Sequence, residues 1–142
     1  MKIQLISNKN VFLQFIPLND EFDQENFKQD KKNRDQFSFD LDVVFSEVDS
    51  AQFMVTIQAE LTKKDQYLMQ MVFVSEFKVD RDIDEAFKTS KFPYVNAPAI
   101  AYPFFRSFVA NTLVNAGWDV HYLPSVNFEK LYNDKNKKHS EK

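Results

Sequence analysis

The sequence predicts an α+β fold in which a four-stranded antiparallel meander carries two C-terminal helices packed on one face. Two patterns support this fold class. Apolar and polar residues alternate strictly over 36–45 and 52–61, and this period of two is typical of half-buried strands. The segment from Pro103 to Asn115 is apolar with helical spacing, and the only glycine of the chain, Gly117, lies just beyond it.

Length and charge indicate a single globular domain. We assign residues 1–132 of the 142-residue chain to this domain and residues 133–142 to a polar flexible tail. The net charge of −3 provides no basic field that would attract nucleic acid. The N-terminus lacks a signal-peptide pattern and no segment is apolar enough for membrane insertion, so we expect a cytoplasmic protein.

The aromatic content is high, with sixteen Phe, five Tyr and one Trp. Two compatible explanations are a core packed with phenylalanine and an aromatic surface used for self-association or ligand contact. The absence of cysteine excludes disulfides, thiolate metal sites and a cysteine nucleophile.

The N-terminal half of the chain contains the predicted sheet. Residues 2–17 alternate, but SNKN at 7–10 interrupts them, which indicates either one irregular strand or a hairpin. Residues 18–35 form a polar loop. Strands at 36–45, 52–61 and 67–74 are separated by the turn sequences EVDSA and TKKDQ, so they should pair as a meander.

The C-terminal half should cover the apolar face of this sheet. We expect residues 80–97 to form a loop with one helical turn at Asp84–Phe87, where Pro93 and Pro98 keep the remainder extended. A helix should begin at Pro103. An extended crossover follows Gly117, and a second helix should begin near Ser125, with Ser125 or Asn127 as its N-cap.

The first helix is too apolar to be covered by one four-stranded sheet. Its polar positions form one narrow stripe, whereas large apolar side chains occupy most of the remaining circumference. We therefore predict an oligomer that encloses this helix, with its contacts made by Phe104, Phe105, Phe108 and Val109.

The sequence contains no pattern typical of a catalytic, metal or cofactor site, so we expect no enzyme activity. Asp80, Asp82 and Asp84 resemble the start of a calcium loop, but the glycine and final glutamate of that loop are missing. The two histidines, His121 and His139, do not form a metal-binding pattern, and one glycine cannot build a phosphate loop.

Three ordered elements resemble the SecB family of protein-export chaperones: AYPFFR at 101–106, Gly117-Trp118, and LPSVNFEKLY at 123–132. The resemblance implies the SecB fold and a homotetramer built as a dimer of dimers. It also implies binding of unfolded polypeptides, such as preprotein clients, without ATP.

The resemblance further implies residues for an apolar client groove. The second helix would contribute Phe128, Leu131 and Tyr132, and the crossover would contribute Trp118 and Tyr122, with Phe39 and Leu41 at the floor. The alternative for each of these residues is a purely structural role in the fold.

Exporting members of the family also dock the SecA motor through carboxylates on the sheet. The corresponding positions here are Asn10, Gln14 and Gln70, so the charge is missing. This difference leaves three roles open: an export chaperone, a chaperone that holds the antitoxin of a toxin–antitoxin system, and a structural or adaptor oligomer without clients.

Overall fold

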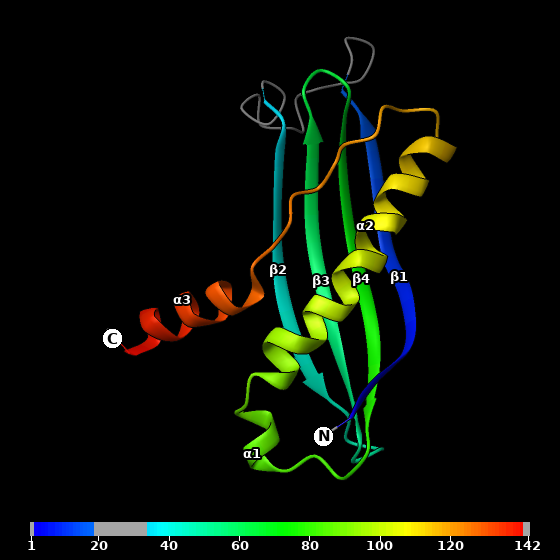
Figure 1. Ribbon diagram of the computed structural model, residues 1–142. Coiled ribbons are helices and arrows are strands. Elements are labelled where there is room, and N and C mark those ends of the chain that lie inside the picture. Colours follow the sequence, from blue (N-terminus) through cyan, green and yellow to red (C-terminus); the bar gives the residue numbers. More distant parts are fainter. Residues whose placement is uncertain (1, 19–33, 141–142) are drawn as a thin grey trace. The chain divides into compact units, whose positions relative to one another are not determined.

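The computed structural model describes residues 2–18 and 34–140, and the side chains of residues 2–18 and 34–137. The elements in chain order are β1 (Ile3–Pro17), β2 (Gln36–Phe45), β3 (Gln52–Lys63), β4 (Tyr67–Val79), α1 (Glu85–Lys88), the π-helix η3 (Phe92–Asn96), α2 (Ala97–Asn115) and α3 (Phe128–Ser140) (Figure 1). This α+β architecture confirms the predicted fold class.

The four strands form one antiparallel sheet in the order β1-β4-β3-β2 (Figure 1). The strands β2, β3 and β4 pair consecutively, which confirms the meander, and β1 joins the free side of β4. Within β1 the SNKN segment continues the strand, so the irregular single strand is correct and the hairpin is not. Among the described strands, β1 and β2 each have one neighbour and form the sheet edges.

The chain divides into two compact units, and every strand contributes to both. The helix-bearing unit contains Met1–Asn8, Val43–Val55 and Ser75–Lys142, and the strand unit contains Lys9–Asp42 and Thr56–Val74. Phe53 is buried in the helix-bearing unit, where its ring stacks on Phe77 at 5.3 Å and meets the edge of Phe87 at 5.6 Å. The strand unit buries Ile57, Leu61 and Met69 completely.

Helix α2 begins at Ala97 and not at Pro103, which corrects the prediction. The segment before it is not extended, because Pro93 lies in the first turn of η3 and Pro98 in the first turn of α2. Proline is favourable there, since the first N–H groups of a helix have no partner within it. Pro103 instead lies inside α2. The predicted turn at 84–87 is confirmed as α1, which Asp84 caps through the Phe87 N–H at 2.8 Å.

Gly117 ends α2 as predicted. It adopts a left-handed φ of 85°, the Gly117 N–H donates to Val114 O, and the Trp118 N–H donates to Leu113 O. This hydrogen-bond pair is the Schellman motif, which satisfies carbonyls at a helix end. Helix α3 continues to Ser140, so the helix is longer than the sequence pattern predicts.

Candidate functional site

The crossover between α2 and α3 is anchored to α2 near Pro124. Residues 118–127 have no regular secondary structure. The Tyr102 hydroxyl of α2 donates a 2.6 Å hydrogen bond to the Pro124 carbonyl, and Leu123 beside it is buried. Burial raises the pKa of this hydroxyl, with Arg106 acting in the opposite direction. The phenol therefore remains a neutral donor and holds the crossover against α2.

Next to this anchor, the crossover exposes a large aromatic side chain. Tyr122 is 84% exposed. It borders a cavity of about 190 Å³ that is lined by Arg106, Ser107, Ala110, Val120, His121, Tyr122 and Leu123. An exposed ring beside a partly apolar hollow can cover an apolar side chain of another polypeptide.

The apolar side of α3 rests on η3 and α2. Asn127 caps the helix by accepting from the Lys130 N–H at 3.0 Å, so Asn127 and not Ser125 is the N-cap. The Phe128 ring meets the edge of Tyr102 at 5.6 Å, and Tyr132 stacks on Tyr94 at 5.9 Å. Phe128 is buried, whereas Leu131 and Tyr132 are half-buried.

A salt bridge accompanies these ring contacts. The Lys91 Nζ lies 2.7 Å from Glu129 Oε1, and both side chains are more than half exposed. The hydrogen bond to Glu129 raises the pKa of Lys91, and the same bond lowers the pKa of Glu129. Both groups are therefore charged at neutral pH, and their attraction joins α3 to the residue before η3.

The predicted groove residues do not all lie in one unit. Five of them belong to the helix-bearing unit: Trp118, Tyr122, Phe128, Leu131 and Tyr132. Phe39 and Leu41 belong to the strand unit, where both are half-buried and Phe39 stacks on Phe37 at 5.5 Å. Sequence reasoning missed Tyr94, Tyr102 and Lys91, which hold α3. The apolar residues of α3 follow i, i+3 and i+4 spacing. This pattern indicates that the helix packs against another surface of the same chain.

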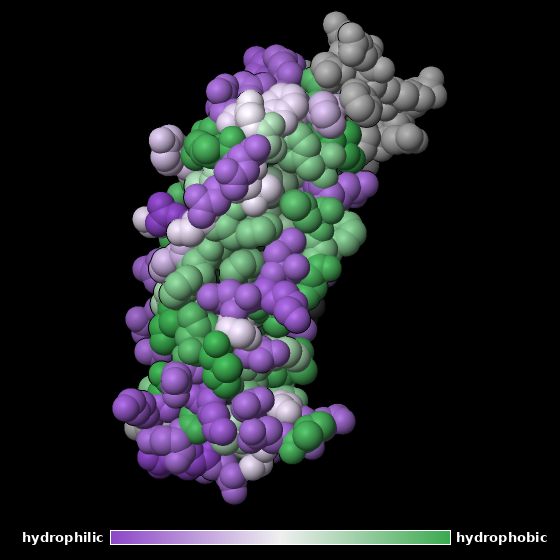
Figure 2. All heavy atoms as spheres, turned by 90° about the vertical axis from the view of Figure 1, so that its right-hand side faces the viewer, coloured by the Kyte–Doolittle hydropathy of each residue, from purple (hydrophilic) through white to green (hydrophobic). Residues whose placement is uncertain are grey.

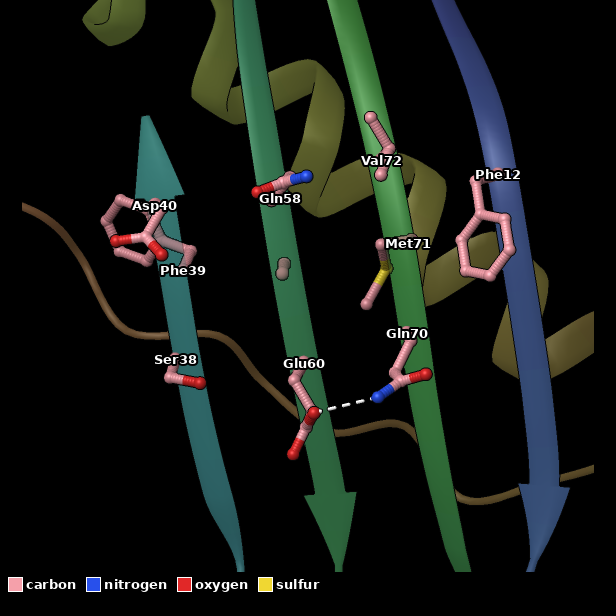
Figure 3. Close-up of a pocket in the computed structure, with 10 residues that line it drawn as sticks. Phe12, Ser38, Phe39, Asp40, Gln58, Glu60, Gln70, Met71 and Val72 are labelled. Carbon is pink, nitrogen blue, oxygen red and sulfur yellow. Dashed lines mark hydrogen bonds between the residues drawn. The ribbon is translucent and has the colours of Figure 1, made fainter. Parts of the chain in front are cut away.

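A second hollow lies on the polar face of the sheet in the strand unit. Its volume is about 400 Å³, and side chains from all four strands line it: Phe12, Ser38, Phe39, Asp40, Gln58, Ala59, Glu60, Gln70, Met71 and Val72 (Figure 3). The Gln70 amide donates to Glu60 at 2.9 Å across adjacent strands (Figure 3). The amide at Gln70 therefore has a carboxylate as its direct neighbour.

The other two amides predicted to face SecA have different surroundings. Asn10 donates to the Phe12 carbonyl at 3.0 Å and is half-buried, whereas Gln14 is exposed. Glu60 and Asp40 are acidic groups of this surface. The alternation of 36–45 and 52–61 placed them on the polar face, but the hydrogen-bonded pair of Glu60 and Gln70 required the register of two strands.

The four residues predicted to form oligomer contacts divide between two sides of α2. Phe105 and Val109 are fully buried within the protomer, so they are not available to another subunit. Phe104 is 49% exposed and Phe108 is half-buried. Exposed apolar residues also occur on β1, where Val11, Phe12 and Leu13 are 56%, 49% and 44% exposed. Figure 2, which views the molecule from the side of β1, shows apolar surface between polar areas.

Comparison with known proteins identifies the family of this chain. The sequence profile described as preprotein translocase subunit SecB matches residues 5–139. The chain belongs to the SecB family. This membership supports a chaperone role, and it confirms the resemblance carried by AYPFFR, Gly117-Trp118 and LPSVNFEKLY.

Two solved structures share this SecB fold. One is the Mycobacterium tuberculosis SecB-like chaperone Rv1957 in complex with a ChAD peptide from the Rv1956 HigA1 antitoxin. It is 15% identical, with a TM-score of 0.63, and the match covers 87% of this chain and 90% of that one. The other is a Streptococcus agalactiae protein of unknown function, 12% identical with a TM-score of 0.53, where the match covers 88% of this chain and 98% of that one.

A comparison with curated proteins found no match for the sequence. Within residues 2–18 and 34–140, no helix is both long and apolar enough to cross a membrane. In the same part of the chain, no three His, Asp or Glu side chains are grouped so that they could hold a metal ion.

Proposed function

We propose that this SecB-family protein is an ATP-independent holdase that binds unfolded polypeptides on the crossover and α3. Membership in the SecB family over residues 5–139 is the observation that carries the proposal. The exposed Tyr122 ring and the half-buried Leu131 and Tyr132 provide apolar surface on these two segments.

The physical basis of such binding is burial of apolar surface from both partners. An unfolded chain exposes aromatic and aliphatic side chains, and covering them stabilises a complex at about 25 cal/mol per Å². Main-chain contacts add affinity without sequence preference. Binding of this kind needs no chemical step, and we propose that the protein acts without catalysis or a cofactor.

A refolding assay tests this function. Full-length protein should suppress aggregation of a client diluted from denaturant, in buffer without nucleotide. Tyr122→Ser should weaken this suppression, because it removes the most exposed ring of the crossover. Val48→Ser is the matched control, since Val48 is 98% exposed in the turn after β2 and lies outside the proposed surface. Unchanged aggregation in the presence of the wild-type protein would exclude the holdase function.

The proposed holdase function has two versions, which differ in whether the client is an antitoxin or a preprotein. The structure of the Mycobacterium tuberculosis relative holds an antitoxin peptide, which favours an antitoxin as the client. A preprotein client would require delivery to SecA, and the amides Asn10, Gln14 and Gln70 replace the carboxylates expected for that docking. Glu60, which accepts a hydrogen bond from Gln70, and Asp40 of β2, which lines the same hollow, leave acidic groups on this surface for a basic partner.

Binding experiments distinguish these roles. Titration of the protein with SecA and, separately, with an antitoxin peptide should detect binding of only one of the two. We propose the cytoplasm as the compartment for either role. Binding of neither, together with failure to suppress aggregation, would favour the structural or adaptor role.

A further inference from the structure

We infer that the hollow between α2 and the crossover is a binding site for a carboxylate, and that it favours clients with an acidic side chain close to the apolar side chain that Tyr122 covers. This inference rests on the proposed holdase function and adds a chemical preference to it. We name the hollow the carboxylate subsite, and its lining residues are Arg106, Ser107, Ala110, Val120, His121, Tyr122 and Leu123.

The charge of its walls distinguishes this hollow from two others on the sheet. The hollow in the strand unit is lined in part by Asp40 and Glu60, and a hollow of about 390 Å³ in the helix-bearing unit is lined in part by Glu47 and Glu76. The seven residues of the carboxylate subsite include a guanidinium and an imidazole but no acidic side chain. The chain as a whole has a net charge of −3, so the subsite is a local reversal of sign that favours an anionic group.

Arg106 is the residue that can bind this anion. Among the described side chains it forms no salt bridge, whereas Arg81 and Lys91 each pair with a carboxylate. Its guanidinium carbon lies 5.8 Å from the centroid of the Tyr102 ring. Such a contact uses the flat face of the guanidinium and leaves its N–H groups for an acceptor in its plane, and a carboxylate matches this fork with two oxygens.

Tyr102 fixes both walls of the subsite. Its ring supports Arg106 on α2, and its hydroxyl donates the 2.6 Å hydrogen bond to the Pro124 carbonyl of the crossover. Leu123, next to Pro124, is buried and lines the hollow. The guanidinium and the chain that faces it are therefore held in place before a client arrives, which lowers the entropic cost of binding.

The size of the subsite suits one side chain. Its volume of about 190 Å³ is below the range of roughly 300–1,000 Å³ that is typical of small-molecule sites. The exposed Tyr122 ring borders the same hollow. In an extended client, side chains two positions apart point to the same side of the chain. The favoured segment therefore has an acidic residue two positions from an apolar one, with the carboxylate at Arg106 and the apolar group at Tyr122.

Paired peptides test the subsite in full-length protein. Two unstructured peptides with blocked ends contain an aromatic residue followed two positions later by either glutamate or the isosteric glutamine. Fluorescence anisotropy should show about two- to five-fold tighter binding of the glutamate peptide, and the difference should shrink at high salt. A glutamine peptide with a free C-terminus distinguishes the two sources of a carboxylate, and it should bind no better than its blocked form.

Variants assign the preference to Arg106. Arg106→Gln should remove the difference between the two blocked peptides. Arg81→Gln is the matched control, since it makes the same change on an exposed arginine outside the subsite and should keep the difference. Ala110→Glu places a carboxylate inside the subsite and should also remove the difference, although Arg106 remains. Tyr122→Ser should weaken binding of both peptides alike. Circular dichroism checks that each variant is folded.

Several results would contradict the subsite, and they are distinguishable from failure of the holdase function. Equal affinity of the wild type for the two blocked peptides would contradict it, and so would a difference that persists in Arg106→Gln or Ala110→Glu. A gain confined to the free C-terminus would overturn the assignment to an acidic side chain. Binding of none of the peptides would also contradict the subsite. Titration with a protein that stays unfolded in buffer then decides the holdase function: binding retains it, and absence of binding rejects both proposals.

Discussion

At the scale of single residues, one of the contacts that attach α3 depends on the ionisation of Glu129. Its carboxylate accepts a hydrogen bond from Lys91, which lowers its pKa, and η3 (FPYVN) adds no charge of its own. At this salt bridge, lowering the pH therefore protonates Glu129.

Acidification should weaken the attachment of α3. A carboxylate whose pKa is lowered by docking stabilises the docked state above its free pKa, and this stabilisation is lost as the pH falls through the docked value. We expect hydrogen-exchange protection of Leu131 and Tyr132 to fall as the pH drops through the lowered pKa of Glu129. Glu129→Gln is the control, and its protection should be lower at neutral pH and should not show the same acid-dependent step.

At the scale of elements, the end of α2 determines the direction of the crossover. Gly117 adopts a left-handed φ of 85°, and a Cβ added there would meet no atom within 4 Å. Replacement would therefore cause backbone strain without a steric clash. A substitution at Gly117 therefore tests the backbone conformation at the helix end without a contribution from steric clashes.

Gly117→Ala should lower the free energy of unfolding by about 1–2 kcal/mol, which is the cost of the left-handed region for a residue with a Cβ. Gly117→Asn should lose less, because asparagine tolerates this conformation. Urea unfolding followed by circular dichroism gives both values. Equal stability of the alanine variant and the wild type would mean that the turn relaxes to another conformation.

The sequence predicted the strands and the glycine stop because their signals are local. Alternation sets the two faces of β2 and β3, and a lone glycine after an apolar helix marks its end. The predicted start of α2 at Pro103 is wrong, because Pro93 and Pro98 do not break helices here but lie in the first turns of η3 and α2. The first residue of a helix thus depends on the conformation of the preceding segment. The local sequence pattern does not contain that information.

The candidate site was less predictable, because its contacts join residues that are distant in the chain. Lys91 and Glu129 are 38 positions apart, and no periodic pattern connects them. Phe104 and Phe105 are chemically identical neighbours, yet one is 49% exposed and the other is fully buried. Only the rotational orientation of α2 relative to the core determines which of these two side chains is buried.

At the scale of the whole molecule, large apolar side chains remain exposed on several segments, and α2 and the edge strand β1 are among them. Phe104 and Ile100 are 49% and 38% exposed on α2, and Val11, Phe12 and Leu13 are exposed on the edge strand β1. Exposed apolar groups at a strand edge favour association with another chain. We therefore propose that the protein assembles as the tetramer expected from the family resemblance.

Phe104→Glu should weaken this assembly, because it would bury a charge in an apolar interface. Multi-angle light scattering should show a smaller oligomer for this variant at concentrations where the wild type is assembled. Asn111→Glu is the control on the exposed polar stripe of the same helix and should not change the mass. A wild-type protein that scatters as a stable monomer would contradict the proposed tetramer.

The two edges of the sheet differ in chemistry, and this difference favours closed over open assembly. Pairing of β1 with β2 of the next copy is head-to-tail, and repetition of that contact would extend without limit. It would place the exposed carboxylates Asp40 and Asp42 of β2 beside the apolar β1 residues, where a charge without a partner is costly. Pairing of β1 with β1 has two-fold symmetry, meets no such cost and stops at two copies. We therefore expect the acidic edge of β2 to disfavour open growth into fibres.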